Sequence, residues 1–362
     1  MKYLISGGGT GGHIFPAVSI ANALRDKDPE ADILFVGALG RMEMERVPQA
    51  GYKIVGLPVR GFFRTHMWKN IGVLKDLIVS IHQVRRVIRD FRPDVAVGVG
   101  GYASGAAMWV AAHMGIPVLL QEQNGFAGVT NKLMKKKAAK ICVAYPHMEK
   151  FFPADKILLT GNPIRQSLLE PQPDKPKDAP KNLLIIGGSL GARTINETII
   201  NHLWELLHSD VQIVWQTGKL YYEQCQEALT QAMINHANLE SNITCTEFVT
   251  DMAKAYHDAD LVISRAGASS ISEICLLGKA SILVPSPNVA EDHQTHNAMV
   301  LVKKDAAIMV ADKDADSDLV RTALELLHKE DLLTSLGENA TQLGFPDAAN
   351  VIADEVMKLG KK

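Results

Sequence analysis

The chain has 362 residues, of which 47% are hydrophobic and 22% charged, as in an ordinary folded protein of about two domains. This composition excludes a disordered chain and a collagen-like repeat. The net charge of -2 conceals an asymmetry, because residues 1–164 carry 21 Lys and Arg against 12 Asp and Glu, whereas residues 165–362 carry 17 against 28. We expect only the basic first half to face an anionic surface.

No stretch of the sequence predicts a membrane span, a signal peptide or a metal-binding cysteine cluster. The most apolar stretch, "GAAMWVAAHMGIPVLL", is interrupted by His113, Gly115 and Pro117, short of the roughly 18 residues that cross a bilayer. The first strand begins beside Lys2 and leaves no room for a signal peptide, so we expect a cytoplasmic chain. The cysteines lack metal-ligand spacing and are predicted to be reduced core thiols: Cys142, Cys225, Cys245 and Cys275.

The chain opens with a predicted strand over residues 2–5, then "GGGTGGH" and a helical pattern. Gly7, Gly9 and Gly12 satisfy the dinucleotide-binding spacing G-x-G-x-x-G. A nicotinamide site also needs an acid at the end of the second strand, whereas residues 33–36 run into "GALGR", and the glycine-rich loops contain no Walker lysine. We therefore predict a loop that lets the backbone approach a ligand and that binds phosphate at a helix N-terminus.

Short runs rich in Val and Ile alternate with segments of helical period along the rest of the chain, the pattern of parallel βαβ units. The first series of strands is predicted at residues 2–5, 33–36, 95–99, 118–120, 141–143 and 157–159. The second is predicted at residues 183–186, 211–215, 261–264, 281–284 and 308–310, with a strand-like "ITCTE" before Phe248. Between them, "EPQPDKPKDAP" is too rich in Pro and charge to pack, which predicts a connector and a domain boundary near residues 161–165.

The second series begins as the first one does. "LIIGGSLGARTINETIINHL", from Leu183, repeats the order of strand, Gly-Gly-Ser turn, further glycine and helix seen at the start of the chain. Two such halves predict an α/β protein with two doubly wound domains whose carboxyl strand ends face one cleft.

Several longer stretches occur in order over nearly the whole chain: "GGGTGGHIFPAVSIANAL", "GVGGYASG", "QEQNGFAG", "GNPIR", "GGSLGAR" and "SRAGASSISE". Together they resemble the MurG family of peptidoglycan N-acetylglucosaminyltransferases. The resemblance implies the glycosyltransferase B fold, with an N-terminal acceptor and membrane-associated domain over residues 1–164. This domain would be completed by the C-terminal helix in residues 345–362, and residues 165–344 would form the donor-binding domain.

The same resemblance implies a reaction. N-acetylglucosamine would pass, with inversion and without a metal or cofactor, from UDP-N-acetylglucosamine to the 4-hydroxyl of the N-acetylmuramyl sugar of lipid I, giving lipid II. The implied partners are these two substrates, an anionic membrane surface and other cell-wall synthesis enzymes, but no nucleic acid. The implied location is peripheral, on the cytoplasmic face of the inner membrane.

The resemblance assigns the donor to residues of both halves. They are Thr10, Gly11, Gly12, Asn124, Arg165, Gly188, Ser189, Phe248, Val249, Ser269, Ser270, Glu273, Gln294 and Asn297. Gly188 and Ser189 would bind the diphosphate at a helix N-terminus, and Gln294 and Asn297 would meet the sugar. Phe248 and Val249 would face the uracil, although plain core is the commoner role for such side chains.

Two donor residues have local alternatives. Glu273 would accept hydrogen bonds from the ribose hydroxyls, but Ser270-x-x-Glu273 also matches a helix capping box. Arg165 would neutralise the leaving diphosphate, but an interdomain salt bridge would explain it as well. His293 stands where some relatives carry an amide, which leaves its sugar contact open.

Catalysis and acceptor binding are assigned to the first half. Inverting transfer needs a base for the attacking hydroxyl, and His13 is the first candidate, because the positive end of a helix dipole favours neutral imidazole. The alternative is that His13 binds pyrophosphate or caps the helix, and Glu122 is the second candidate for the base. Gly9, Tyr102 and Ser104 are assigned to the acceptor.

The sequence also contains a possible metal-binding motif and a possible membrane-contacting turn. "DKD" occurs at residues 26–28 and 312–314, but the second copy lies in "DKDADSD", which predicts a solvated turn before a helix, so no metal site is expected. From Gly61, apolar residues alternate with cations, and the turn expected to dip into an anionic leaflet contains Phe62, Phe63, Met67 and Trp68. Leu74, Leu77, Ile78, Ile81 and Val84 are predicted to form the buried stripe of the next helix.

Three classes of function remain at this point: a lipid-linked glycosyltransferase, a UDP-N-acetylglucosamine 2-epimerase of the same architecture, and a noncatalytic nucleotide-sugar-binding subunit. An epimerase has no need of a basic amphipathic surface, and a binding subunit has no need of His13 and Glu122 together. We therefore favour the transferase.

Overall fold

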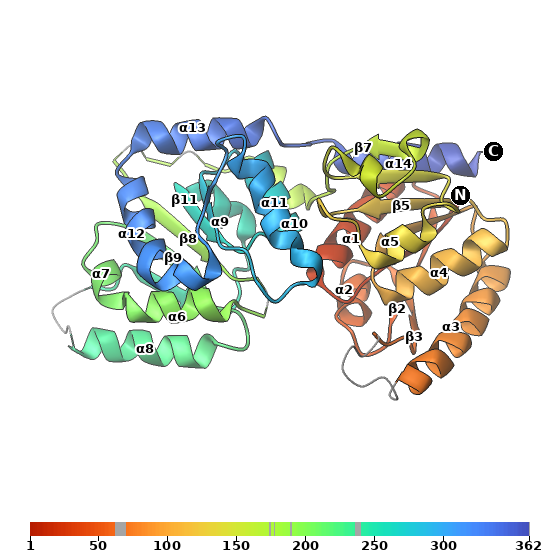
Figure 1. The fold of residues 1–362 in the computed structure, drawn as a ribbon, viewed down its shortest axis with the longest axis horizontal. Helices are drawn as coiled ribbons and strands as arrows, with labels where there is room; N and C mark the ends of the chain where they lie inside the picture. Colours follow the sequence, from red (N-terminus) through yellow and green to blue (C-terminus); the bar gives the residue numbers. More distant parts are fainter. Residues whose placement is uncertain (62–69, 174, 177, 189, 236–239, 362) are drawn as a thin grey trace. The chain divides into compact units, whose positions relative to one another are not determined.

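The computed structural model describes residues 1–61, 70–173, 175–176, 178–188, 190–235 and 240–361. The chain divides into two compact units (Figure 1), the first made of Met1–Arg165 with Phe345–Lys362 and the second of Gln166–Gly344. Each unit is built around its own parallel sheet.

The sheet of the first unit has the order β3-β2-β1-β4-β5-β6-β7. Its strands are β1 (Lys2–Gly7), β2 (Asp32–Ala38), β3 (Lys53–Leu57), β4 (Val95–Gly100), β5 (Val118–Glu122), β6 (Lys140–Val143) and β7 (Ile157–Leu159). Its helices are α1 (Gly11–Lys27), α2 (Glu43–Gln49), α3 (Asn70–Phe91), α4 (Tyr102–His113), α5 (Val129–Met134) and α14 (Ala348–Gly360). The central strand β4 is buried along its whole length because helices cover both faces of the sheet.

The second unit repeats this plan with the order β10-β9-β8-β11-β12-β13. Its strands are β8 (Asn182–Ile186), β9 (Gln212–Gln216), β10 (Ile243–Thr246), β11 (Leu261–Ser264), β12 (Ser281–Leu283) and β13 (Ile308–Met309). Its helices are α6 (Arg193–Asn201), α7 (Leu203–Leu207), α8 (Tyr222–Asn235), α9 (Met252–Asp258), α10 (Ala268–Leu276), α11 (His293–Val302), α12 (Ala315–Leu327) and α13 (Glu330–Thr341). The predicted pair of doubly wound α/β folds is confirmed.

The C-terminal helix α14 belongs to the first unit. Ala349, Ile352, Ala353 and Val356 are buried in the core that also contains α1, and Lys27 of α1 lies 2.8 Å from Asp354. The first unit is therefore assembled from the two ends of the chain.

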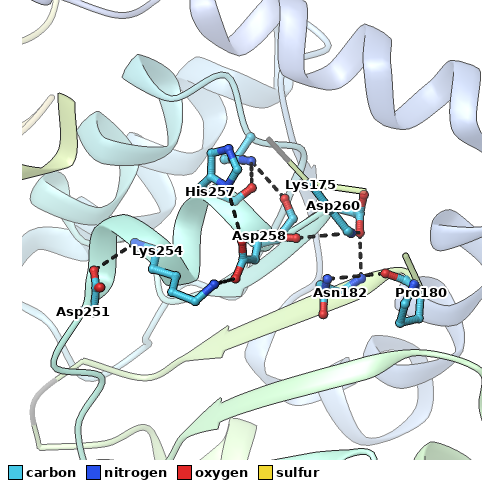
Figure 2. A network of polar contacts seen from close by, with 10 residues as sticks. Lys175, Pro180, Asn182, Asp251, Lys254, His257, Asp258 and Asp260 are labelled. Atoms are coloured by element: carbon cyan, nitrogen blue, oxygen red, sulfur yellow. Dashed lines mark hydrogen bonds and ion pairs between the residues drawn. The ribbon is translucent and has the colours of Figure 1, made fainter. Parts of the chain in front are cut away.

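The proline-rich connector is fastened to the second unit. Lys175 Nζ donates to Asp260 Oδ2 at 2.5 Å and to the Asp258 carbonyl at 3.4 Å, while Asp260 also accepts from the Asn182 backbone N–H (Figure 2). The prediction that this segment is too polar to pack was wrong at Lys175, because one half-buried ion pair satisfies its charge.

The cysteines were predicted to be reduced core thiols. All four cysteines are free, and burial raises the pKa of Cys142, Cys225 and Cys275 to about 12, as expected of inert core thiols.

The apolar stripe predicted for α3 is wrong at two positions, because Leu74 and Ile78 are 55% and 51% exposed. The prediction is confirmed for Leu77, Ile81 and Val84, which pack inward together with Val73 and Ile88.

Candidate functional site

The glycine loop of the first unit lies at the point where the strand order reverses, between β1 and β4. In open parallel sheets this is where ligands bind, beyond the carboxyl ends of the strands. The Gly8 N–H donates to the Gly100 carbonyl at 3.3 Å, which joins the loops that follow β1 and β4. Gly9 and Thr10 are exposed, whereas Gly8 is buried.

His13 lies in the first turn of α1, half-buried, with its ring turned back toward the glycine loop. Its Nδ1 lies 3.0 Å from the Gly8 carbonyl and 3.4 Å from Thr10 Oγ1. A carbonyl only accepts, so Nδ1 carries the proton in the shorter of these two contacts. The helix-capping alternative is therefore wrong, since a capping group would have to accept from backbone N–H groups.

Glu122 ends β5 and is 1% exposed. One carboxylate oxygen accepts from the Gly128 N–H and the Asn131 side chain, both at 2.9 Å; the other accepts from the backbone and side chain of Asn124. Burial raises the pKa of Glu122 above its ordinary value, and these hydrogen bonds oppose the rise. The geometry makes Glu122 the anchor of the loop over residues 124–128.

The other first-unit residues assigned to substrates differ in their access to solvent. Tyr102 begins α4 and is 59% exposed, Asn124 is half-buried, and Gly11 and Gly12 form the half-buried first turn of α1. Ser104 is fully buried and its hydroxyl has no hydrogen-bond partner among the described residues, so its acceptor assignment rests on the resemblance alone. Arg165 places its guanidinium 5.1 Å from the centre of the Phe15 ring.

In the second unit, a glycine turn follows β8 beside the reversal of strand order between β8 and β11. Gly188 has φ of 83° and Gly191 has φ of 88°; a Cβ on Gly191 would lie 2.2 Å from the Thr217 carbonyl, so only glycine fits there. The turn leads into the N-terminus of α6, where backbone N–H groups attract phosphate. Ser189 lies outside the described residues.

Gln216, at the end of β9, was not predicted as a site residue. Its Nε2 donates to the Gly188 carbonyl at 3.4 Å, and its Oε1 accepts from the Val249 N–H at 2.9 Å. One buried amide therefore holds both the glycine turn and the Phe248–Val249 segment, in which Phe248 is 39% exposed and Val249 buried. Its only sequence signal was its place at the end of a strand.

Glu273 lies in α10 and is 7% exposed, with Oε2 accepting from the Tyr256 hydroxyl at 3.1 Å. The helix begins at Ala268 with Gly267 as its N-cap, so Ser270 is not a cap residue and the capping-box alternative is wrong. Ser269 and Ser270 lie in the first turn of the same helix.

Gln294 and Asn297 both lie on α11 and both bind backbone. Gln294 Oε1 accepts from the Ser286 N–H at 2.9 Å. The two N–H donors on Nε2 can therefore bind other groups. Asn297 is fully buried and donates to the Ala266 carbonyl at 3.3 Å, at the entry to α10. Asn297 thus connects α11 to the start of α10.

The acidic turn after β13 is occupied by an ion pair. Arg265 donates to Asp312 and to the carbonyls of Val284 and Pro285, and Thr194 donates to the other oxygen of Asp312 at 2.9 Å. Over the ranges described, no group of three or more His, Cys, Asp or Glu side chains is arranged to hold a metal ion. The predicted solvated turn at residues 312–314 is therefore wrong in part, because Asp312 is a packing partner of Arg265.

The predicted membrane turn, with Phe62, Phe63, Met67 and Trp68, lies outside the described residues. Among the described helices, none is long and apolar enough to span a bilayer.

The sequence matches known proteins over its full length. Residues 3–143 match the model of the glycosyltransferase family 28 N-terminal domain, and residues 182–352 match that of its C-terminal domain. Two relatives are described as UDP-N-acetylglucosamine–N-acetylmuramyl-(pentapeptide) pyrophosphoryl-undecaprenol N-acetylglucosamine transferases. The one from Parabacteroides distasonis is 56% identical over 99% of this chain and 98% of the relative; the one from Bacteroides fragilis is 57% identical over 100% and 96%.

Solved structures agree with these matches. The crystal structure of MurG from Acinetobacter baumannii superposes with a TM-score of 0.77 at 31% identity and covers 99% of this chain and 100% of that one. A UDP-GlcNAc 2-epimerase from Neisseria meningitidis superposes with a TM-score of 0.67 at 13% identity, covering 99% of this chain and 100% of that one. At that identity the likeness concerns the fold alone.

Proposed function

The chain belongs to glycosyltransferase family 28, among its MurG transferases, and from this premise we propose how its residues perform the reaction. It transfers N-acetylglucosamine from UDP-N-acetylglucosamine to lipid I and so forms lipid II in peptidoglycan synthesis. Two substrates, one a nucleotide sugar and the other a lipid-linked sugar, therefore have to be bound.

The second unit binds the donor in this proposal. The N-terminus of α6 and the Gly188 turn receive the diphosphate, since backbone N–H groups and the helix dipole favour an anion there. Glu273 accepts from the ribose hydroxyls with the carboxylate that Tyr256 holds, and Gln294 donates to the sugar. Arg165 adds positive charge for the leaving diphosphate in this proposal.

The first unit binds the acceptor and supplies the base. As the acceptor 4-hydroxyl attacks the anomeric carbon, its proton passes to Nε2 of His13 and the bond from that carbon to the diphosphate oxygen breaks. The contact of His13 Nδ1 with the Gly8 carbonyl carries this assignment, because it places the proton on Nδ1 and the basic lone pair on Nε2. Exposed Gly9, in the glycine loop, and exposed Tyr102, at the start of α4, contact the acceptor in this proposal.

The activity itself is tested by transfer of labelled N-acetylglucosamine from the UDP donor to a lipid I analogue in the presence of EDTA. We expect undiminished product, because helix N-termini and Arg165 replace a cation at the diphosphate. Loss of transfer in EDTA, with recovery on addition of Mn2+ or Mg2+, would contradict metal-independent transfer.

In the same assay, Glu273→Gln should raise the KM for the donor and leave the acceptor KM unchanged. An unchanged donor KM would remove Glu273 from the ribose site.

The protein is associated with the membrane, and we propose that it works peripherally on the cytoplasmic face of the inner membrane. Helices α3, α4 and α5 are successive neighbours in the first unit (Figure 1) and expose large apolar side chains: Leu74, Ile78, Val79, Trp109, Val129 and Leu133. Exposed cations lie on α3 and just after α5, including Lys75, Arg85, Arg86, Lys136 and Lys137. Apolar side chains among cations favour an anionic leaflet.

We expect the protein to sediment with vesicles containing phosphatidylglycerol, to bind less to pure phosphatidylcholine vesicles, and to be released by salt. Leu74→Ser with Ile78→Ser should weaken this binding. The matched control is Leu220→Ser with Ile234→Ser, which removes two even more exposed apolar side chains from the second unit. Equal losses in both double variants would contradict the assignment of the surface to α3.

A further inference from the structure

A buried carboxylate that the proposed reaction does not use lies directly beneath the glycine loop. Glu43, the first residue of α2, is completely buried. Its Oε2 accepts from the Gly9 N–H at 2.9 Å and its Oε1 accepts from the Ala38 N–H at 3.0 Å. The sequence has no acid at the end of β2. The fold nevertheless brings the carboxylate of Glu43, from the following helix, to Ala38 at the end of that strand.

This carboxylate is connected to His13 through a single peptide group. The Gly9 N–H and the Gly8 carbonyl are the two ends of one planar peptide unit. Glu43 accepts from the N–H end, and His13 Nδ1 donates to the carbonyl end at 3.0 Å. The order is therefore carboxylate, peptide group, imidazole, with a hydrogen bond on each side of the peptide.

Close packing fixes the orientation of this peptide group. A Cβ on Gly8 would lie 2.1 Å from Glu43 Oε1, and a Cβ on Gly37 would lie 2.6 Å from Glu43 Cγ. On the other side, a Cβ on Gly101 would lie 2.5 Å from the Gly8 carbonyl oxygen. Three positions without side chains let the carboxylate, the loop and the start of α4 approach one another this closely.

The arrangement has a chemical consequence for the imidazole. Hydrogen bonds in a chain polarise one another, so a carboxylate at the N–H end makes the Gly8 carbonyl a better acceptor. A stronger acceptor at Nδ1 favours the neutral tautomer with its proton on Nδ1. In that tautomer Nε2 carries the lone pair, which is the form that a base requires.

We propose that Glu43 is a positioning residue for His13, orienting the Gly8–Gly9 peptide group so that His13 keeps its proton on Nδ1 and presents Nε2 as base. Glu43 touches no substrate and exchanges no proton: the proton from the acceptor hydroxyl stays on Nε2 until it passes to solvent. This assignment rests on the proposed role of His13, so its test must distinguish failure of that role from failure of the positioning.

The first test is a double-mutant cycle with Glu43→Gln and His13→Ala, using single-turnover transfer at saturating substrates. Glutamine has nearly the shape of glutamate, but its amide places an NH2 group against one of the two backbone N–H donors, that of Gly9 or that of Ala38. We expect Glu43→Gln to lower kcat about 10- to 100-fold, by analogy with residues that orient metal-binding side chains from behind. The donor KM and the circular dichroism spectrum should not change.

In the His13→Ala background, Glu43→Gln should have almost no further effect, because residues that act as a unit are not additive. The matched control is Glu45→Gln, an exposed acid on the same helix, which should leave kcat unchanged. The same factor lost in both backgrounds would overturn the positioning role, and so would an unchanged kcat in Glu43→Gln. If His13→Ala itself lost no activity, the role of His13 as base would fail first.

The second test does not depend on activity, and its wild-type measurement does not depend on how well Glu43→Gln folds. Nitrogen-15 NMR of the wild-type imidazoles, with the His13 signal assigned by its loss in His13→Ala, should show His13 as the Nδ1–H tautomer at a pH where the ring is neutral. Glu43→Gln should shift His13 toward a mixture of tautomers. An Nε2–H tautomer in the wild type, or an unchanged tautomer in a folded Glu43→Gln variant, would overturn the proposal.

Discussion

Replacing His13 with alanine is expected to lower the turnover of lipid I about 10²- to 10⁴-fold, the usual contribution of general base catalysis. Without the imidazole, the attacking 4-hydroxyl must lose its proton to water. Single-turnover transfer of labelled N-acetylglucosamine measures the effect directly. Binding of UDP-N-acetylglucosamine, measured by calorimetry, should change little, because most of the residues proposed to bind the donor lie around α6, α10 and α11 of the second unit.

His113→Ala is the matched control for this variant. His113 ends α4 in the same unit, is exposed, and bonds only to its own helix through the Trp109 carbonyl and ring in the contacts described for it. Its replacement should leave turnover within about twofold, since surface substitutions away from such features have small effects. A His13→Ala enzyme with wild-type turnover would show that His13 only shapes the loop.

Replacing Glu122 with alanine is expected to lower the stability of the first unit by about 2 to 3 kcal/mol. The substitution removes the acceptor of four donors: the Asn131 side chain is buried, whereas the hydrogen bonds from Gly128 and Asn124 are partly buried and cost less to lose. Hydrogen exchange over residues 122–131 measures the local effect, with exchange faster by on the order of 10²-fold. Glu149→Ala, an exposed acid of the same unit, should leave exchange there unchanged.

The stability that Glu122 contributes to the first unit should also depend on pH. Burial raises the folded pKa of Glu122 above 4.5, so in the interval above that value the folded chain binds more protons than the unfolded one. The contribution of Glu122 to the free energy of unfolding therefore falls as pH rises through this interval. The stability difference between wild type and Glu122→Gln should shrink accordingly. A difference that grew with pH would mean that the hydrogen bonds outweigh burial.

The strands could be predicted because their signal is local. Runs such as residues 95–99 and 261–264 are almost entirely apolar, as is typical of buried parallel strands, and they correspond to β4 and β11. The edge strand β3 was missed because it is short and only partly buried, and Gly56 interrupts its apolar run. Leu74 and Ile78 were misplaced because helical period identifies an apolar stripe but not which side of it meets the core.

The candidate site could be predicted only where the resemblance to a family reached it. Glycines and a histidine after a strand predicted a ligand loop, but the contact that decides the protonation of His13 is with a backbone carbonyl, which no side-chain pattern reports. Glu43 and Gln216 were missed for the same reason: both act on backbone groups far along the chain. The assignments of Phe62 to Trp68 and of Ser189 stay predictions.

The position of α14 has a consequence for how the protein is made. A ribosome that has just completed residue 165 has delivered every strand of the first unit, yet α1 still lacks the helix that buries its outer apolar face. At about 5 to 20 residues per second, that helix follows about 10 to 40 seconds later. The second unit, continuous from residue 166 to 344, can finish first. During this interval the nascent first unit exposes the apolar surface that α14 later covers, and a chaperone can bind to it.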